Sequence, residues 1–397
     1  MTRNFSRGVA LVAAAFITCA AAAAPVVIDT EQKANAAVLS AQKALTVPKQ
    51  ELEGMAGYAR SLAESALEPL AAATTPMAVI NSRNGVVVAC STSGTLTARM
   101  ARTFPRVLKL RWQACKFNDL NGYPHVRNGD AEIILLSDSF VPEKVGGIRL
   151  GTLNSDFTDT RHIEDPEQIT DEVNSANLRL IGLIPMTRAF PRFGVFVGEF
   201  AFETTGYSQS YFRAEVPGQP VYEQTSSTSV EHLVASGSTT YDSSKTHSVE
   251  DLRLYFGKVT HSSTSPNYPS STSSYTINGL KVRHEFDYVA WTSSKSVDGK
   301  VEFQYSPAAG ACLNGEYNIK TRKRLAGSLF EFKYDSGDLL INGSTTAQFF
   351  TAANVPPTLP VPQSGNLVHI DVRNLGSFNY DASDLSILAQ NAQCFGG

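Results

Sequence analysis

One segment alternates in character over nine residues: Leu280-Lys281-Val282-Arg283-His284-Glu285-Phe286-Asp287-Tyr288. Its even positions offer an apolar or aromatic surface, and its odd positions carry charges. A period of two residues is that of a β-strand, whose successive side chains point to opposite faces. The segment therefore predicts a strand with one buried face and one face in water.

The same alternation recurs elsewhere in the chain, and Asn-Gly or Asp-Gly pairs interrupt it. These pairs are Asn84-Gly85, Asn128-Gly129, Asp298-Gly299, Asn314-Gly315 and Asn342-Gly343. They suit the two central positions of a type I′ turn, which require positive φ. We therefore expect a mainly β protein, an antiparallel meander that forms curled sheets or a sandwich.

Residues 1–23 have the features of a secretory signal peptide. A basic start with Arg3 and Arg7 leads into a short apolar core and an alanine run that ends at Ala23. An alternative is a lipoprotein that is acylated at Cys19. No later stretch is long and apolar enough to form a membrane-spanning helix. We therefore expect a periplasmic or secreted protein of a bacterial cell envelope.

Residues 24–75 form the helical region of the sequence. Apolar side chains recur there every three or four residues, and Pro48 interrupts the pattern, which predicts an α-helical hairpin. An amphipathic helix normally buries its stripe within the same molecule, so we expect the hairpin to cover the sheet. The alternative is a helix pair that binds a partner or mediates assembly.

Two β regions follow, at residues 76–155 and 176–397. Residues 156–175 between them are rich in acids and predict a solvated connector. Inside the second region, the tracts 224–248 and 261–274 are crowded with serine and threonine, and they predict long exposed hairpin loops.

Four cysteines remain once the leader is removed, an even number that favours disulfides in an exported chain. Three pairings are possible, and we prefer Cys90 with Cys115 and Cys312 with Cys394. No two cysteines have the close C-x-x-C spacing that is typical of a metal site. We expect no metal and no cofactor.

The sequence makes no positive case for an enzyme. It has no H-E-x-x-H, no G-x-S-x-G, no Walker loop and no dinucleotide fingerprint. His284 lies in the apolar row of its strand, which favours a hydrogen-bonded core histidine over a ligand or a base. Trp291, in phase with the polar row, is the candidate for stacking against a sugar ring.

The charge balance indicates no nucleic-acid partner. The formal net charge is −3, and it becomes about −5 without the leader and its two arginines. The preferred hypothesis is an exported, non-enzymatic envelope or secreted protein that binds or scaffolds an envelope protein or a glycan. One alternative is an envelope hydrolase whose site is assembled from distant residues. Another is an outer-membrane-associated β protein, which the alternating strands also allow.

Overall fold

The computed structural model describes fourteen stretches of the chain, and every structural statement below concerns these residues. They are residues 24–47, 49–52, 85–90, 92–100, 106–118, 124–135, 148–165, 168–186, 198–244, 246–306, 311–328, 334–363, 365–381 and 386–392.

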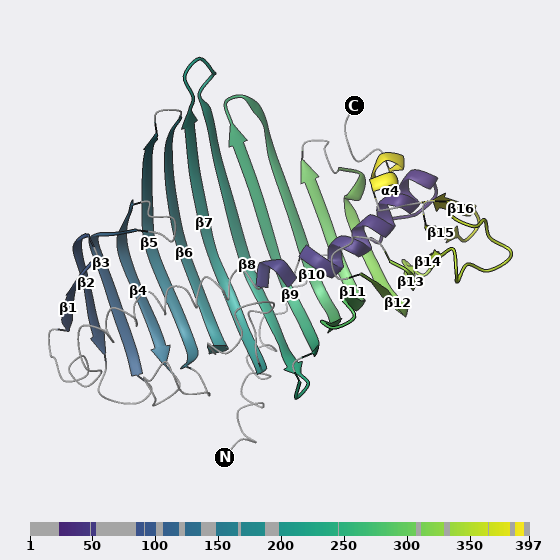
Figure 1. The fold of residues 1–397 in the computed structure, drawn as a ribbon, viewed down its shortest axis with the longest axis horizontal. Coiled ribbons are helices and arrows are strands. Elements are labelled where there is room, and N and C mark those ends of the chain that lie inside the picture. The colour runs from purple at the N-terminus through teal and green to yellow at the C-terminus, as the bar shows by residue number, and fades with distance from the viewer. Residues whose placement is uncertain are drawn as a thin grey trace.

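The described strands form one antiparallel sheet of 16 strands in chain order, so each strand pairs with its sequence neighbours (Figure 1). The predicted meander is confirmed, whereas a sandwich of two sheets is not.

Two short helices, η1 (Ala311–Leu313) and α4 (Ser386–Asn391), lie near the C-terminal end of the sheet. The strands are β1 (Val86–Ala89), β2 (Ser93–Met100), β3 (Arg106–Asn118), β4 (Pro124–Leu135), β5 (Ile148–Asp165), β6 (Gln168–Met186), β7 (Gly198–Glu215), β8 (Tyr222–Tyr241), β9 (His247–Ser265), β10 (Tyr268–Asp287), β11 (Thr292–Ser306), β12 (Gly315–Ser328), β13 (Ser336–Ile341), β14 (Thr345–Thr351), β15 (Asn366–Val372) and β16 (Gly376–Asp381).

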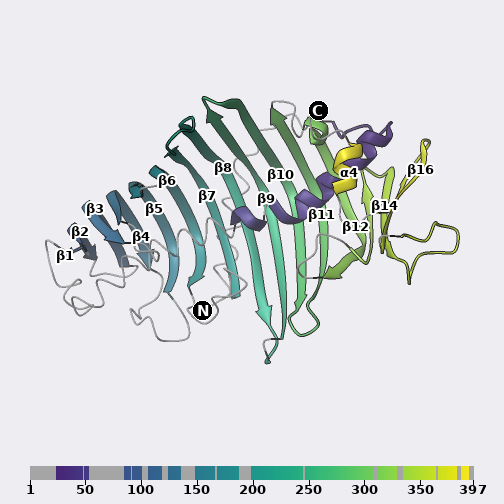
Figure 2. The ribbon, with the colours of Figure 1, turned by 45° about the horizontal axis from the view of Figure 1, so that its top comes forward.

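An N-terminal helix, residues 31–47 and 49–52, crosses one face of the sheet (Figures 1 and 2). Its start is capped by Thr30, whose Oγ1 accepts a hydrogen bond from the backbone N of Lys33 at 3.3 Å. The helix is amphipathic, and its fully buried apolar residues recur at steps of three, four and seven. They are Ala34, Ala37, Val38, Ala41, Ala44, Leu45 and Leu52.

This helix and the sheet face beneath it form the core. Side-chain contacts follow the crossing from β16 to β9, since Asn35 donates to Tyr380 Oη and Lys49 pairs with Glu250. We call the covered side the inner face and the opposite side the outer face. The helix that was predicted to cover the sheet is therefore present, while residues 53–75, the expected second half of the hairpin, lie outside the described residues.

The Asn-Gly and Asp-Gly pairs have two different structural roles. Asn342-Gly343 forms the predicted hairpin turn: both residues have positive φ, 50° and 67°, and the backbone N of Ser344 donates to Ile341 O. The same prediction is wrong for Asp298-Gly299, which lies inside β11 where the pairing register shifts. A glycine bulge and a type I′ turn both place a residue at positive φ, so the sequence pair alone does not separate them.

A bulge also explains why the apolar row of β10 changes phase. Ile277 and Leu280 are both buried although they are three positions apart, because Asn278-Gly279 adds an extra residue and Gly279 adopts φ of +71°. Downstream of that bulge the alternation predicted for Leu280 to Tyr288 holds as far as His284, with Val282 and His284 buried on the inner face. Phe286 is half-buried, and Tyr288 lies in the turn after β10. The bulge thus brings both halves of β10 into contact with the same core.

Two regions predicted as irregular are strands. Within the acidic segment, residues 156–165 lie in β5 and residues 168–175 lie in β6, and the two strands pair directly, so the segment is a hairpin and not a connector. The Ser/Thr-rich tracts likewise lie largely in β8, β9 and β10, where Ser227 pairs with Ser262. Composition suggested loops because these strands show polar side chains on both faces.

The first expected disulfide is present. Cys90, just after β1, is bonded to Cys115 in β3, with a Cα–Cα distance of 5.4 Å. Cys312 is also disulfide-bonded, but Cys394 lies outside the described residues, so its pairing with Cys312 stays a prediction. Among the parts of the chain that the structure describes, no helix is both long and apolar enough to span a membrane.

Candidate functional site

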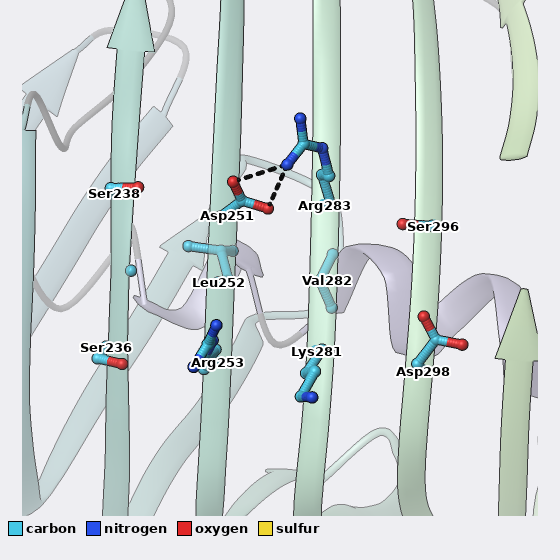
Figure 3. Close-up of a pocket in the computed structure, with 11 residues that line it drawn as sticks. Ser236, Ser238, Asp251, Leu252, Arg253, Lys281, Val282, Arg283, Ser296 and Asp298 are labelled. Carbon is cyan, nitrogen blue, oxygen red and sulfur yellow. Dashed lines mark hydrogen bonds and ion pairs between the residues drawn. The ribbon is translucent and has the colours of Figure 1, made fainter.

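A shallow groove lies on the outer face, over the middle of β8, β9, β10 and β11 (Figure 3). Three hydroxyl groups line it, those of Ser236, Ser238 and Ser296. Five charged side chains line it as well: Asp251, Arg253, Lys281, Arg283 and Asp298. The groove encloses about 610 Å³, a volume within the usual range of small-ligand sites, but its polar lining differs from the mostly apolar lining typical of them.

A network of ion pairs fixes one side of the groove. Arg283 donates from Nη1 to both carboxylate oxygens of Asp251, at 3.2 and 3.0 Å, and its Nη2 lies 2.7 Å from Glu285 Oε1. Arg324 of β12 pairs with the other oxygen of Glu285 at 2.5 Å. Burial works to raise the pKa of Glu285, but the hydrogen bond from Arg283 and the charge of Arg324 outweigh it, so this pKa lies below its ordinary value.

The other side of the groove holds two cations that face each other. Arg253 and Lys281 are directly opposite in the register of β9 and β10, and neither forms an ion pair with another described residue. Asp298 is opposite Lys281 on β11, but its Oδ1 accepts a hydrogen bond from the backbone N of Thr321 at 3.0 Å. Like charges directly opposite on neighbouring strands destabilise a sheet.

Two exposed aromatic residues adjoin these cations. Tyr255 and Phe256 follow Arg253 along β9, at an irregularity in its pairing with β8, and they are 47% and 42% exposed. Tyr255 Oη lies 3.0 Å from Ser236 Oγ, so the phenol ring is tied to the groove wall. The outer face therefore combines cations, hydroxyls and aromatic rings within a few neighbouring strands.

The inner face holds a buried histidine, His284. His284 is buried beneath the N-terminal helix, where its ring donates a hydrogen bond to the backbone of Leu45. Burial, together with the positive charges of Lys49 and Lys295, lowers the pKa of His284 to about 3. The prediction of a core histidine is confirmed, since the helix covers the ring and keeps it neutral.

A second histidine lies between a hydroxyl and a carboxylate. His261 Nδ1 is 3.0 Å from Thr228 Oγ1, and His261 Nε2 is 3.1 Å from Glu51 Oε1. Thr228 comes from β8, His261 from β9 and Glu51 from the N-terminal helix. This order of groups is the one that activates a hydroxyl nucleophile in hydrolases.

The predicted aromatic candidate lies elsewhere. Trp291 is 49% exposed, but it belongs to the turn between β10 and β11, with φ of +55°, and not to the polar row of a strand. It does not line the outer groove. Trp291 therefore lies apart from the groove, whereas Ser236 and Ser238 of the tract 224–248 line it. A sugar-binding role for Trp291 stays a prediction.

Arg253 and Lys281 could not be recognised as a pair from the sequence, because they meet only through the register of β9 and β10. One local signal was available, the run Lys320-Thr321-Arg322-Lys323-Arg324 on the neighbouring strand β12. Within the described stretches, no group of three or more histidine, cysteine, aspartate or glutamate side chains is placed to hold a metal ion.

No protein-family model, no curated protein and no solved structure matches this chain. The geometry of the outer groove is therefore the basis on which a function is inferred.

Proposed function

We propose that this chain is an exported, non-enzymatic binding protein of the cell envelope or the secreted fraction, and that its ligand lies in the outer groove. The observation that carries this proposal is the groove itself, where hydroxyl and charged side chains from four strands converge on a face that the core does not use. Hydroxyl groups, cations and carboxylates offer donors and acceptors to a polar, hydrated ligand such as a glycan.

A rigid platform supports this assignment. The groove lies on paired strands, the inner face of which is anchored by the helix, and the Asp251–Arg283–Glu285 network holds the side chains of one wall. A site on strands is held more precisely than a site on loops. Binding to such a surface needs little rearrangement of the backbone.

The proposal is tested by filling the groove. In the variant Ser238→Tyr/Ser296→Tyr two rings replace two small side chains on the outer face, and tyrosine suits a strand. We expect the variant to lose binding to soluble polysaccharides, measured by affinity electrophoresis against neutral dextran and acidic polygalacturonate. Thr346→Tyr, a polar residue of β14 away from the groove, is the matched control and keeps wild-type binding. Equal binding by all three proteins contradicts the proposal.

Export has its own test. Fractionation of the host cells, followed by sequencing of the mature N-terminus, is expected to recover a soluble protein that begins at Ala24. A chain acylated at Cys19 favours the lipoprotein alternative, and a chain that keeps Met1 contradicts export.

A second candidate function rests on the Thr228–His261–Glu51 arrangement. Both distances at His261 are hydrogen-bonding distances, so the ring is placed to accept the proton of the Thr228 hydroxyl while Glu51 orients it. The test is hydrolysis of small activated esters by the wild-type protein and by His261→Gln. Turnover that disappears in the variant favours the hydrolase, and no turnover above the uncatalysed rate removes it.

A further inference from the structure

The cations of the outer face continue beyond the groove onto β12. Lys320, Arg322 and Lys323 are all exposed, and none of them forms an ion pair with another described residue. Lys320 is opposite Asp298 in the register, so Arg253, Lys281, Asp298 and Lys320 make one row across β9, β10, β11 and β12. We call the five cations Arg253, Lys281, Lys320, Arg322 and Lys323 the basic band.

The carboxylates near the basic band have other partners. Asp338, opposite Lys323 in the register, accepts a hydrogen bond from Gln348. Asp251 and Glu285 bind Arg283 and Arg324, and Asp298 accepts the backbone N–H of Thr321. The band is therefore a local excess of positive charge in a protein whose net charge is −3. Because opposed like charges cost stability in a sheet, an anion bound between Arg253 and Lys281 is favoured twice, by direct attraction and by relief of that repulsion.

The surroundings of the band indicate which anion it takes. Tyr255 and Phe256 offer aromatic faces beside Arg253, and sugar rings stack on such faces. Ser236 and Asp298 offer oxygens that accept hydrogen bonds from hydroxyl groups. Cations, aromatic rings and acceptors together match a sugar chain that also carries carboxylate, phosphate or sulfate groups.

We infer that the outer face binds an acidic polysaccharide, with its anionic substituents on the basic band and its rings against Tyr255 and Phe256. This inference rests on the proposed function and names the ligand class of the same groove. Adjacent strands are about 4.8 Å apart, so Lys281 on β10 and Lys320 on β12 are separated by roughly 10 Å and engage successive charged groups of one linear chain. The acceptors Ser236 and Asp298 suit the hydroxyl groups of a sugar chain, and the phosphate groups of an anionic bilayer or of DNA offer no such donors.

The test compares polymers that differ in charge. The purified full-length protein is run by affinity electrophoresis through gels that contain polygalacturonate, dextran sulfate or neutral dextran. We expect retardation by the two acidic polymers, little or none by dextran, and weakening as sodium chloride is raised. Binding to anionic phosphatidylglycerol vesicles and to single-stranded DNA is measured at the same ionic strength and is expected to be weaker.

The decisive variant is Arg253→Ser/Lys281→Ser, which we expect to weaken binding to both acidic polymers about tenfold or more. Arg99→Ser/Arg373→Ser is the matched control, because it removes the same charge from exposed positions outside the band and is expected to bind as the wild type does. Circular dichroism confirms that both variants are folded.

The outcomes separate this inference from the proposed function. Dextran binding as tight as polygalacturonate binding, unchanged in Arg253→Ser/Lys281→Ser but lost in Ser238→Tyr/Ser296→Tyr, overturns the acidic ligand and leaves the groove as the site. Absence of binding to every polysaccharide overturns both. Tighter binding to the vesicles or to the DNA than to either acidic polymer overturns the choice of ligand class.

Discussion

Protonation of His284 is expected to destabilise the protein at acid pH. Its ring is buried under the N-terminal helix, with Glu250 of β9 and Lys295 of β11 opposite in the register and Lys49 nearby on the helix. An unfolded histidine titrates near 6.5, whereas burial and the two lysines lower the pKa of His284 in the fold to about 3. Between these values the unfolded chain binds the additional proton, so stability is full above about pH 6.5 and falls as the pH falls towards 3.

The size of this effect follows from the two pKa values. Each pKa unit corresponds to about 1.4 kcal/mol, so lowering the pH from 7 to 4 is expected to remove about 3 kcal/mol of unfolding free energy through His284 alone. In His284→Gln the amide still offers a donor to the Leu45 backbone but does not titrate. The variant is therefore expected to lose about 3 kcal/mol less than the wild type over the same pH range.

Urea unfolding at a series of pH values, followed by tryptophan fluorescence, measures this difference. Other acid-sensitive groups contribute equally to both proteins and cancel in the comparison. His369→Gln is the control, because the His369 ring lies on the outer face beside Asn379 and is not under the helix. Identical pH profiles for wild type and His284→Gln would refute the buried, neutral histidine and with it the packing of the helix on β10.

Three further changes test the fold. Gly299→Ala is expected to lower the unfolding free energy by about 2 kcal/mol or more, because φ is +132° and the new Cβ would lie 2.2 Å from the backbone oxygen of Gly279. In the control Gly343→Ala the new Cβ meets no atom within 4 Å, and the expected loss in the same urea titration is only about 1 kcal/mol. Leu45→Ala removes a fully buried helix side chain and is expected to lower the unfolding free energy by about 3 kcal/mol, whereas a loss below about 1 kcal/mol would contradict the helix–sheet core. Cys90→Ser/Cys115→Ser is expected to cost about 3 kcal/mol in the chain-entropy model, and a non-reducing peptide map of the wild type must show the bond that the variant lacks.

Strands with one apolar row could be predicted from the sequence, because burial of that row imposes the two-residue period. Leu280 to His284 shows this. The helical stripe from Ala34 to Leu52 could be predicted in the same way from its own period of three to four residues. Strands that are polar on both faces could not be predicted in the same way. Ser227 and Ser262 pair because the residues before and after them in β8 and β9 are also paired, which fixes the register of the two strands. The sequence of such a tract alone shows only a hydrophilic composition.

The candidate site depends on register, which local sequence does not determine. The bulge at Asn278-Gly279 shifts the pairing of β10 with β11 and so sets Lys281 opposite Asp298. A shift of one residue in β10 would move Lys281 to the inner face. The groove is thus a product of strand pairing, whereas Trp291 was conspicuous in the sequence and lies in a turn. Only the basic run on β12 pointed to this face.

The central claim, that the outer face of β9 to β12 holds the ligand, is tested most directly by a lysine footprint. The protein is acetylated with a water-soluble reagent in the presence and absence of polygalacturonate, and each lysine is quantified by mass spectrometry. We predict protection of Lys281 and Lys320, with no change at Lys109, an exposed lysine of β3 far along the sheet. Equal acetylation of Lys281 and Lys320 with and without saturating polymer would contradict the account.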